Sequence, residues 1–291
     1  MGLRINQNIA AMNAYRNLSI NTDQMGKSLE KLSSGFRINR AADDAAGLSI
    51  SEGLRAQTGG LKVAVRNAQD GVGVIQTAEG ALTETHAILQ RMRDLAVQAS
   101  NGGSQDADAQ AAANTEFGQM QTELDRIANT TSFGGQKLLD GSYNGTFQVG
   151  ASNTSSDQIS VDLSTATLTT SLSANGATGL SSAGLGVDPA TTDLSSTANA
   201  QKAIDSVDKA IKSVSTVRAT LGAYQNRFEH TINNINVAVE NLSASESRIR
   251  DTDMAQEMVS MTRSQILSQA GQSMLSQANQ APQQVLQLLR G

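Results

Sequence analysis

The chain has 291 residues, a net charge of −5 and no cysteine, and these facts exclude several classes of function. The excess of acidic over basic residues argues against nucleic acid as the main partner. The lack of cysteine excludes disulfides, thiolate catalysis and cysteine-ligated zinc. Aromatic residues make up only 3% and proline occurs twice, which leaves little bulk for a thick globular core but allows long unbroken helices.

The N-terminal segment is predicted to be a basic helix. Between Asn6 and about Leu32 apolar side chains recur at heptad spacing, and residues 1–40 carry six basic and two acidic groups, a local charge of +6 − 2 = +4. Gly35 predicts a left-handed stop, and Asp43 and Asp44 predict the capped start of the next helix. The stripe of the first helix consists of Leu18, Met25, Leu29, Leu32 and Phe36.

Two further helices are expected in the first half of the chain. One follows Asp44 and runs to about Ala99, and the other runs from Asp106 to about Ala128. Glycines at positions 53, 59, 60, 71, 73 and 80 do not form a phosphate-binding loop. We interpret them as small residues that let neighbouring helices approach closely.

The pattern changes between residues 133 and 165, where alternating apolar residues and turn residues predict one or two β-hairpins. From Ala151 to Ala200, 20 of 50 residues are serine or threonine, and no lysine or arginine occurs between residues 138 and 201. This composition is typical of a low-complexity connection, so we expect an exposed loop at about residues 165–195.

After this loop, apolar residues follow a three-four step from Ile204 to Ile249, which predicts a helix of about 50 residues and roughly 75 Å. Such a helix cannot bury its stripe alone, and the helix of residues 44–99 is a partner of matching length. The predicted fold is therefore mainly α, a long antiparallel helical coiled-coil rod with a small β-hairpin region.

The last helix has an unusual composition. From Ser264 to Leu289 the chain runs 26 residues without a charge, and eight of them are glutamine. This segment is too polar to span a bilayer, yet it lacks the charges that normally solvate the outer face of a soluble helix. We therefore predict an assembly surface, made of Leu267, Met274, Val285 and Leu288 with Leu29 and Leu32 of the first helix.

No residue pattern predicts a catalytic, metal or cofactor site. The two histidines, His86 and His230, are isolated in the sequence. Met254, Met258 and Met261 have a spacing typical of a core or interface. No run of 18 apolar residues occurs, and the first residues are too polar for a signal peptide, so this evidence alone favours a cytoplasmic protein without membrane insertion.

Several motifs resemble those of bacterial flagellins. Residues 32–39 (LSSGFRIN) and 42–48 (ADDAAGL) are similar to the N-terminal flagellin signature, as are residues 67–71 (NAQDG) and 79–82 (EGAL). Residues 278–286 (ANQAPQQVL) are similar to the flagellin C-terminus. The resemblance covers roughly residues 1–140 and 195–291, with separate motifs in the right order at both ends.

The resemblance implies a structural subunit that polymerises into the flagellar filament and serves motility. Residues 1–43 and 246–291 would be the inner-tube helices, and residues 44–245 the outer-tube helical rod, with hairpins at about 133–165. Only residues 165–195 are available for the outer domains of larger flagellins, which implies a short form without them. The resemblance also implies export through the flagellar secretion apparatus, and therefore a secreted, extracellular protein in place of the cytoplasmic one.

The implied partners are other copies of the chain, the hook–filament junction and cap proteins, the flagellin export chaperone and a host receptor. Residues 89–98, together with Glu116, resemble the segment that the flagellin-sensing Toll-like receptor binds. This makes Arg91, Leu95 and Glu116 candidate receptor contacts. The alternative role for these three residues is packing between subunits in a filament.

Three other functions remain as alternatives. A hook–filament junction protein shares the terminal helices of flagellin but usually carries a larger, dissimilar middle. A membrane-active helical protein is suggested by the uncharged tail, although its density of glutamine argues against it. An enzyme is the least favoured class.

Overall fold

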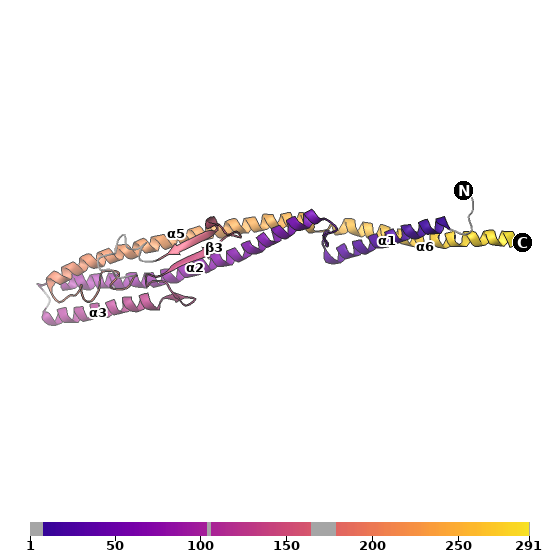
Figure 1. Cartoon of the computed structure of the whole chain (residues 1–291). Helices are drawn as coiled ribbons and strands as arrows, with labels where there is room; N and C mark the ends of the chain where they lie inside the picture. Colours follow the sequence, from indigo (N-terminus) through magenta and orange to yellow (C-terminus); the bar gives the residue numbers. More distant parts are fainter. Residues whose placement is uncertain (1–7, 104–105, 164–178, 291) are drawn as a thin grey trace. The chain divides into compact units, whose positions relative to one another are not determined.

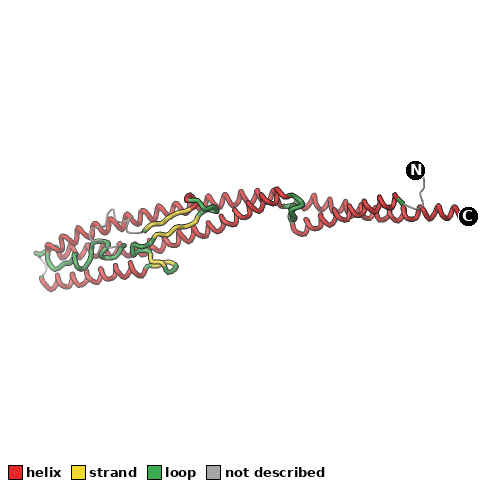
Figure 2. The backbone as a smooth tube through the Cα atoms, viewed as in Figure 1, coloured by secondary structure: helices red, strands yellow, loops and turns green. Residues whose placement is uncertain are grey.

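The computed structural model describes residues 8–103, 106–163 and 179–290, with side chains up to residue 280 in the last range. The described chain is mainly helical, as Figures 1 and 2 show. Its helices are α1 (Ile9–Ser34), α2 (Ala45–Ala99), α3 (Ala107–Thr130), α5 (Thr197–Arg250) and α6 (Met254–Arg290). The chain divides into two compact units: unit 1 comprises Met1–Gln57 and Glu240–Gly291, and unit 2 comprises Thr58–Val239.

The helix ends follow the local signals in the sequence. Gly35 adopts φ 77° after α1, and its N–H donates to the Lys31 carbonyl, which closes the helix. The Asp44 carboxylate accepts a 2.8 Å bond from the Gly47 N–H at the start of α2. Asp106 caps α3 by accepting from the Ala109 N–H at 2.8 Å. The predicted stop at Gly35 and the cap by Asp44 are confirmed, whereas Asp43, also predicted as a cap, accepts from the N–H groups of Asn39 and Arg40 in the preceding turn.

Unit 2 holds the main core, built where α2 and α5 pack antiparallel and α3 lies beside them. Two ion pairs fix the direction: Arg93 Nε lies 2.6 Å from Asp208 Oδ1, and Arg218 Nη2 lies 3.7 Å from Glu79 Oε1. Leucine, isoleucine, valine and alanine from all three helices form one buried cluster. The expected pairing of two long heptad helices is confirmed, because neither could bury its stripe alone.

Two β-hairpins occur in unit 2. The first pairs β1 (Ser132–Phe133) with β2 (Gln136–Lys137) through Gly134 and Gly135, which both have positive φ, as this tight turn requires. The second pairs β3 (Asn144–Gln148) with β4 (Gln158–Asp162), with the short 3-10 helix η1 (Ser155–Asp157) between them.

The second hairpin packs against the long helices. Phe147 meets Phe228 of α5 edge to face with 5.5 Å between the ring centroids, and Asn67 Nδ2 of α2 donates to the Gln148 carbonyl at 3.0 Å. A side chain at Gly71 of α2 would place its Cβ 2.7 Å from the Phe228 ring. The absence of a side chain at Gly71 therefore lets α5 bring the ring of Phe228 against α2.

Residues 179–194 form a strap on α3, and this corrects part of the sequence prediction. We expected an exposed loop at about residues 165–195, but Leu180, Leu185, Val187 and Leu194 are buried in the core of unit 2. Residues 164–178, which carry the rest of that prediction, lie outside the described residues. Serine and threonine dominate the composition, so they conceal four apolar side chains that are spaced irregularly.

Candidate assembly surface

The helices α1 and α6 pair antiparallel within unit 1. At one end the Asn8 side chain caps α1 and donates from Nδ2 to the Ala278 carbonyl at 2.7 Å. At the other end Lys31 Nζ lies 3.9 Å from Glu257 Oε2. The two helices therefore run alongside one another over most of the length of α1.

Most of the side chains that meet between α1 and α6 are small or polar, with Leu18, Met25, Leu32, Met261 and Leu275 among them, and they follow a three-four step on both helices. A side chain at Gly271 would place its Cβ 3.4 Å from Leu18, so the backbone of α6 passes close to α1. The partly or fully buried positions are Ala11, Ala14, Leu18, Asn21, Met25, Ser28 and Leu32 on α1 and Met261, Ser264, Ser268, Gly271, Leu275 and Ala278 on α6.

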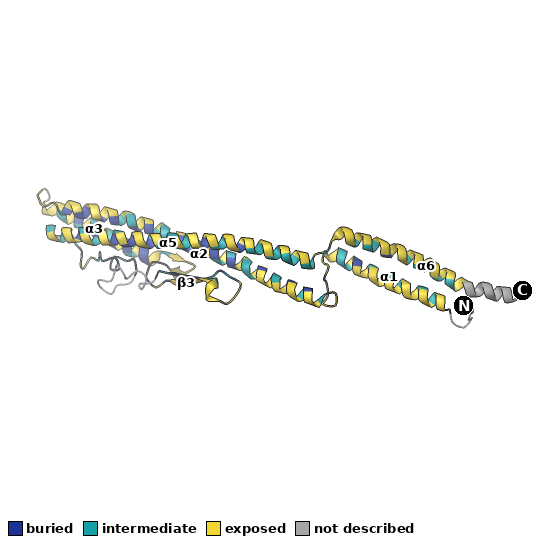
Figure 3. Ribbon diagram, turned by 90° about the horizontal axis from the view of Figure 1, so that it is seen from above, coloured by how far each residue is buried: buried dark blue, intermediate teal, exposed yellow. Residues whose placement is uncertain are grey.

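Many large apolar side chains of this pair are exposed instead of buried between the two helices. Figure 3 shows mainly exposed and intermediate positions on α1 and α6, whereas buried positions gather in unit 2. Among the described residues of unit 1, Ile38 is the only fully buried apolar side chain. The exposed ones are Ile9, Met12, Tyr15, Ile20 and Leu29 on α1 and Met254, Met258, Val259, Ile266, Leu267 and Met274 on α6, which we name the terminal apolar surface.

Some of the predicted assembly residues lie on the terminal apolar surface, and one lies at the contact between α1 and α6. Leu267 and Met274 are 45% and 60% exposed, and Leu29 is 55% exposed, so all three belong to the terminal apolar surface. Leu32 instead faces α6 and is half-buried. Val285 and Leu288 lie in α6, but their side chains are outside the described part of the chain.

Leu267 and Met274 line a groove of about 510 Å³ between the two helices. The α1 side of the groove consists of small or polar residues except for Ile20, so apolar contact comes mainly from Ile20, Leu267 and Met274. A second hollow, of about 490 Å³, lies on α6 and is lined by Met258, Val259, Thr262, Arg263, Ile266 and Leu267. Leu267 thus lines both hollows.

The loop after α1 is anchored to the junction of α5 and α6. Phe36 and Asp251 form a β-bridge, and the Arg37 N–H donates to the Arg250 carbonyl at 2.7 Å. Arg37 Nη2 also donates to the Ile249 carbonyl at 2.6 Å. These bonds satisfy the last carbonyls of α5, which have no partner within the helix.

Arg250 holds the same junction from the other side. Its guanidinium lies 4.9 Å from the centroid of the Phe36 ring, and its Nη1 donates to Glu52 Oε1 of α2 at 2.6 Å. The Arg250 side chain is only 14% exposed. One arginine therefore connects α5, α2 and the loop that follows α1.

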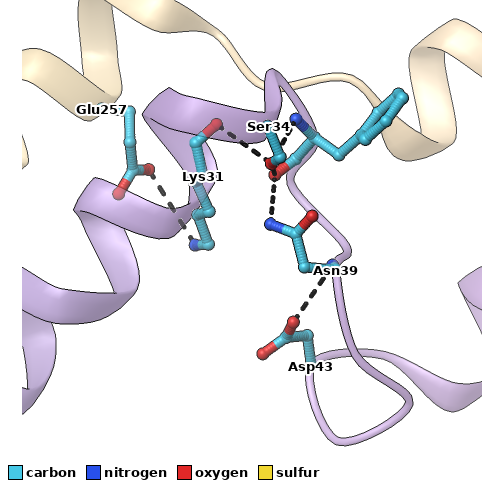
Figure 4. Close-up of polar contacts among 6 residues, drawn as sticks. Lys31, Ser34, Asn39, Asp43 and Glu257 are labelled. Carbon is cyan, nitrogen blue, oxygen red and sulfur yellow. Dashed lines mark hydrogen bonds and ion pairs between the residues drawn. The ribbon is translucent and has the colours of Figure 1, made fainter.

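Figure 4 shows the polar contacts of that loop. Ser34 Oγ accepts from the Phe36 N–H at 3.1 Å, and Asn39 Nδ2 donates to the Phe36 carbonyl at 3.1 Å. Asp43 Oδ2 accepts from the N–H groups of Arg40 at 3.0 Å and Asn39 at 3.2 Å. The Arg40 bond, followed by the Asn39 bond and nearby lysines, lowers the pKa of Asp43 below 3.8. Asp43 thus stabilises a turn, and it serves no acid–base chemistry.

The candidate receptor residues are only partly brought together. Arg91 Nε and Nη2 both donate to Glu116 Oε1, at 2.9 and 2.7 Å, and both side chains are about half exposed. Leu95, by contrast, is 2% exposed and belongs to the core of unit 2. The structure therefore corrects the expectation that a leucine flanks this ion pair at the surface, because position 95 lies on the inward stripe of α2.

The described residues offer no arrangement for metal or nucleophilic chemistry. They contain no cluster of three or more His, Asp and Glu side chains that could hold a metal ion. His86 Nε2 lies 3.0 Å from the side-chain nitrogen of Gln90, one helical turn away in α2. No helix in the described part of the chain is long and apolar enough to cross a membrane.

Two features were not predicted from the sequence. The first is the junction formed by Arg37 and Arg250, because nothing in the sequence indicates that positions more than 200 residues apart are neighbours. The second is the exposure of Met254 and Met258 on α6, because the spacing of these methionines indicated only a core or an interface. A signal existed for the strap: Gln121 interrupts the buried stripe of α3, and a buried amide needs partners.

Comparisons with known proteins agree with this organisation. A model of the bacterial flagellin N-terminal helical region matches residues 5–144, and a model of the bacterial flagellin C-terminal helical region matches residues 204–289. The chain is 54% identical to a flagellin of Halalkalibacterium halodurans, over 98% of this chain and 99% of that protein. It is 51% identical to a flagellin of Bacillus subtilis, over 99% of this chain and 100% of that protein.

A solved structure of Bacillus cereus flagellin is also similar. It shares 31% identity and a TM-score of 0.46, and the match covers 62% of this chain and 94% of that one.

Proposed function

The chain belongs to the bacterial flagellin family and is a structural subunit of the flagellar filament, and we propose that it polymerises through the terminal apolar surface of α1 and α6. It is a filament protein and not an enzyme, and its place is the extracellular filament. The two matched regions leave only residues 145–203 between them, so it is a short flagellin.

The observation that carries the proposal is the difference in burial between the two units. Unit 2 has a continuous apolar core, whereas unit 1 keeps eleven large apolar side chains of α1 and α6 exposed. Burial of one such side chain contributes about 1.5–3 kcal/mol. Because ordering the backbone costs about 1–2 kcal/mol per residue, a helix pair with small residues at its contact needs further partners.

The charge of the surface favours a second copy of the chain as that partner. The described side chains of α6 beyond Arg263 are all uncharged, and glutamine and serine alternate with the apolar residues. Neutral amides do not repel identical helices, so copies of α6 can approach one another at low electrostatic cost. Leu267, which lines both hollows, and Met274, which lines the groove, would lie in the middle of that contact.

The direct test is seeded polymerisation of the double variant L267Q/M274Q. Glutamine keeps the helix and the net charge but removes apolar area, so we expect the polymerised fraction to fall about tenfold or more. Filament yield would be measured by sedimentation after adding short filament seeds, and by negative-stain electron microscopy.

The matched control is S276Q, which adds a glutamine at an exposed position of the same helix that lines neither hollow. It should polymerise like the parent chain. Normal filament yield from L267Q/M274Q would contradict the proposed surface, while leaving the membership of the family untouched.

We further propose that the junction and cap proteins and the export chaperone bind this chain. The support is the family resemblance at both ends, together with an exposed apolar surface that a monomer must keep from non-specific contact before assembly. Co-purification of each candidate with the parent chain and with L267Q/M274Q tests this. Binding that is lost in the variant would support the terminal apolar surface as the shared contact.

For the host Toll-like receptor we propose contacts from Arg91 and Glu116 alone. Their mutual pairing presents an arginine fork and a carboxylate at the surface, whereas Leu95 is buried. R91A should weaken receptor signalling in a reporter-cell assay. The control is R93A, which removes a neighbouring arginine paired to Asp208, and equal losses from the two variants would contradict a specific role for Arg91.

A further inference from the structure

The methionines of this chain are concentrated where its core is thinnest. There are nine in the sequence; Met1 lies outside the described residues, and Met92 and Met120 lie in unit 2. The other six are in α1 and α6, which together have 26 + 37 = 63 residues. These six are Met12, Met25, Met254, Met258, Met261 and Met274.

Four of these side chains are open to solvent. Met12 and Met274 are each 60% exposed, Met258 is 53% exposed and Met254 is 48% exposed, whereas Met92 in unit 2 is fully buried. Met274 lines the groove between α1 and α6, and Met258 lines the hollow on α6. The chain has no cysteine and no tryptophan, so these thioethers are its most readily oxidised side chains.

We propose that Met258 and Met274, with Met12 and Met254, are oxidation sites in the monomer, and that their conversion to sulfoxide by a peroxide switches off polymerisation. The sulfur donates a lone pair to one peroxide oxygen, the O–O bond breaks, and methionine sulfoxide and water form. Sulfur is oxidised by two electrons and the peroxide is reduced. The inference rests on the assembly surface proposed above.

The effect follows from the polarity of the product. A sulfoxide is a strong hydrogen-bond acceptor on a side chain that was apolar, and burial in an interface without a donor is unfavourable. The linings around Met258 and Met274 are mainly apolar, and their side-chain donors are Thr262 and Arg263 in the hollow and Asn17 and Asn21 in the groove. The same burial that makes a sulfoxide costly would also shield the thioether once a filament has formed.

The first experiment treats purified monomer with hydrogen peroxide, maps sulfoxide at each methionine by peptide mass spectrometry, and then adds filament seeds. We expect sulfoxide at Met12, Met254, Met258 and Met274 before Met92, and a polymerised fraction lowered about tenfold. Reduction by methionine sulfoxide reductase with a dithiol should restore assembly. Normal polymerisation of chains that carry sulfoxide at Met258 and Met274 would overturn the proposal.

The second experiment uses the variant M12L/M254L/M258L/M274L, because leucine has similar volume and resists oxidation. The polymerised fraction of the untreated variant is measured first as its own reference, and peroxide should not lower the fraction below that reference. Inhibition as strong as in the parent chain would place the sensitive group elsewhere and refute the proposal. M258Q/M274Q gives an independent readout: it mimics the added polarity and should lose assembly without peroxide.

A third measurement separates this inference from the assembly surface itself. Preformed filaments of the parent chain are exposed to the same peroxide, and sulfoxide is compared with the monomer. Protection of Met258 and Met274 in filaments supports both. If filaments form but Met258 and Met274 oxidise as fast as in the monomer, both the proposed assembly surface and the oxidation proposal are wrong. If the two methionines are protected in filaments but oxidised monomers still assemble normally, only the oxidation proposal is wrong.

Discussion

Single residues decide where helices in this flagellin can approach one another. A side chain at position 71 would displace the Phe228 ring, because a Cβ added to Gly71 would lie 2.7 Å from that ring. The ring cannot withdraw freely, because it also packs edge to face on Phe147. Gly80, on the same helix, is exposed, and a Cβ added there would meet nothing within 4 Å. Two glycines in one helix therefore have opposite roles.

We expect G71A to destabilise the chain by about 1–3 kcal/mol, because the added methyl overpacks the contact with Phe228. G80A should be neutral or stabilise by about 0.5–1 kcal/mol, since alanine is favoured over glycine inside a helix. Chemical denaturation followed by circular dichroism measures both. Equal effects of the two substitutions would contradict the close approach at Gly71.

The lowered pKa of Asp43 leads to a prediction about how the turn before α2 depends on pH. Its pKa is lowered in the folded chain by N–H donors from Arg40 and Asn39, so its stabilising bonds are complete above the unfolded value near 3.8. They are lost as pH falls through the lower, folded pKa. An NMR titration should therefore give a pKa below 3.8 for the Asp43 carboxyl.

The matching variant is D43N. At neutral pH the amides of Asn39 and Arg40 should exchange with solvent faster in D43N than in the parent chain, because the charged acceptor is gone. The difference should shrink below the folded pKa of Asp43. Identical exchange at neutral pH would show that this carboxylate does not hold the turn.

At the scale of elements, the strap of residues 179–194 is attached to one face of α3. Gln121 Nε2 donates to the carbonyls of Val187 at 2.8 Å and Thr192 at 3.0 Å. Asp125 accepts from the N–H and hydroxyl of Ser182, and Asn114 accepts from the Leu194 N–H. Side chains of α3 thus replace the regular pairing that an irregular backbone lacks.

We predict that Q121M loosens the strap, because methionine fills the space but leaves two carbonyls without a donor. The expected cost is about 1–3 kcal/mol, with faster hydrogen exchange across residues 180–194. Q119M, at an exposed position of the same helix, should change stability by less than about 0.5 kcal/mol. A strap as well protected in Q121M as in the parent chain would show that apolar burial alone holds it.

At the scale of the whole molecule, the two units differ in how much apolar surface they bury. The continuous cluster of buried residues runs from Ala64 to Ile235 in unit 2, whereas α1 and α6 meet through small and polar side chains. Such a difference gives a protein regions of unequal local stability. The part with the weaker internal contacts is also the part that we propose to bind other copies.

Limited proteolysis of dilute monomer tests this contrast. Cleavage within α1 and α6 should precede cleavage within the stretches of α2, α3 and α5 that belong to unit 2, and polymerisation should abolish the early cuts. A chain truncated before Ser264 should keep the helix content of unit 2 and fail to polymerise. Filaments from the truncated chain would rule out a role for that segment of α6 in assembly.

The sequence by itself determined that the long helices form and where α1 ends and α2 begins, because heptad spacing, Gly35 and Asp44 act locally, but it did not locate the break between α5 and α6. It also determined the antiparallel pairing of α2 with α5, since two long stripes of equal length leave few alternatives. The prediction that Leu267 and Met274 serve assembly rests on their helical spacing within an uncharged segment, and it stays a prediction.

Only the tertiary structure decided which stripe of α6 faces α1. Ser264, Ser268 and Gly271 lie on that face together with Met261 and Leu275, whereas Leu267 and Met274 stay outside, and the small residues allow the backbone of α6 to approach α1 closely. It also decided that Leu95 is buried beside an exposed Arg91–Glu116 pair, and that a serine-rich segment docks on α3. Each depends on contacts between distant positions, which no local pattern encodes.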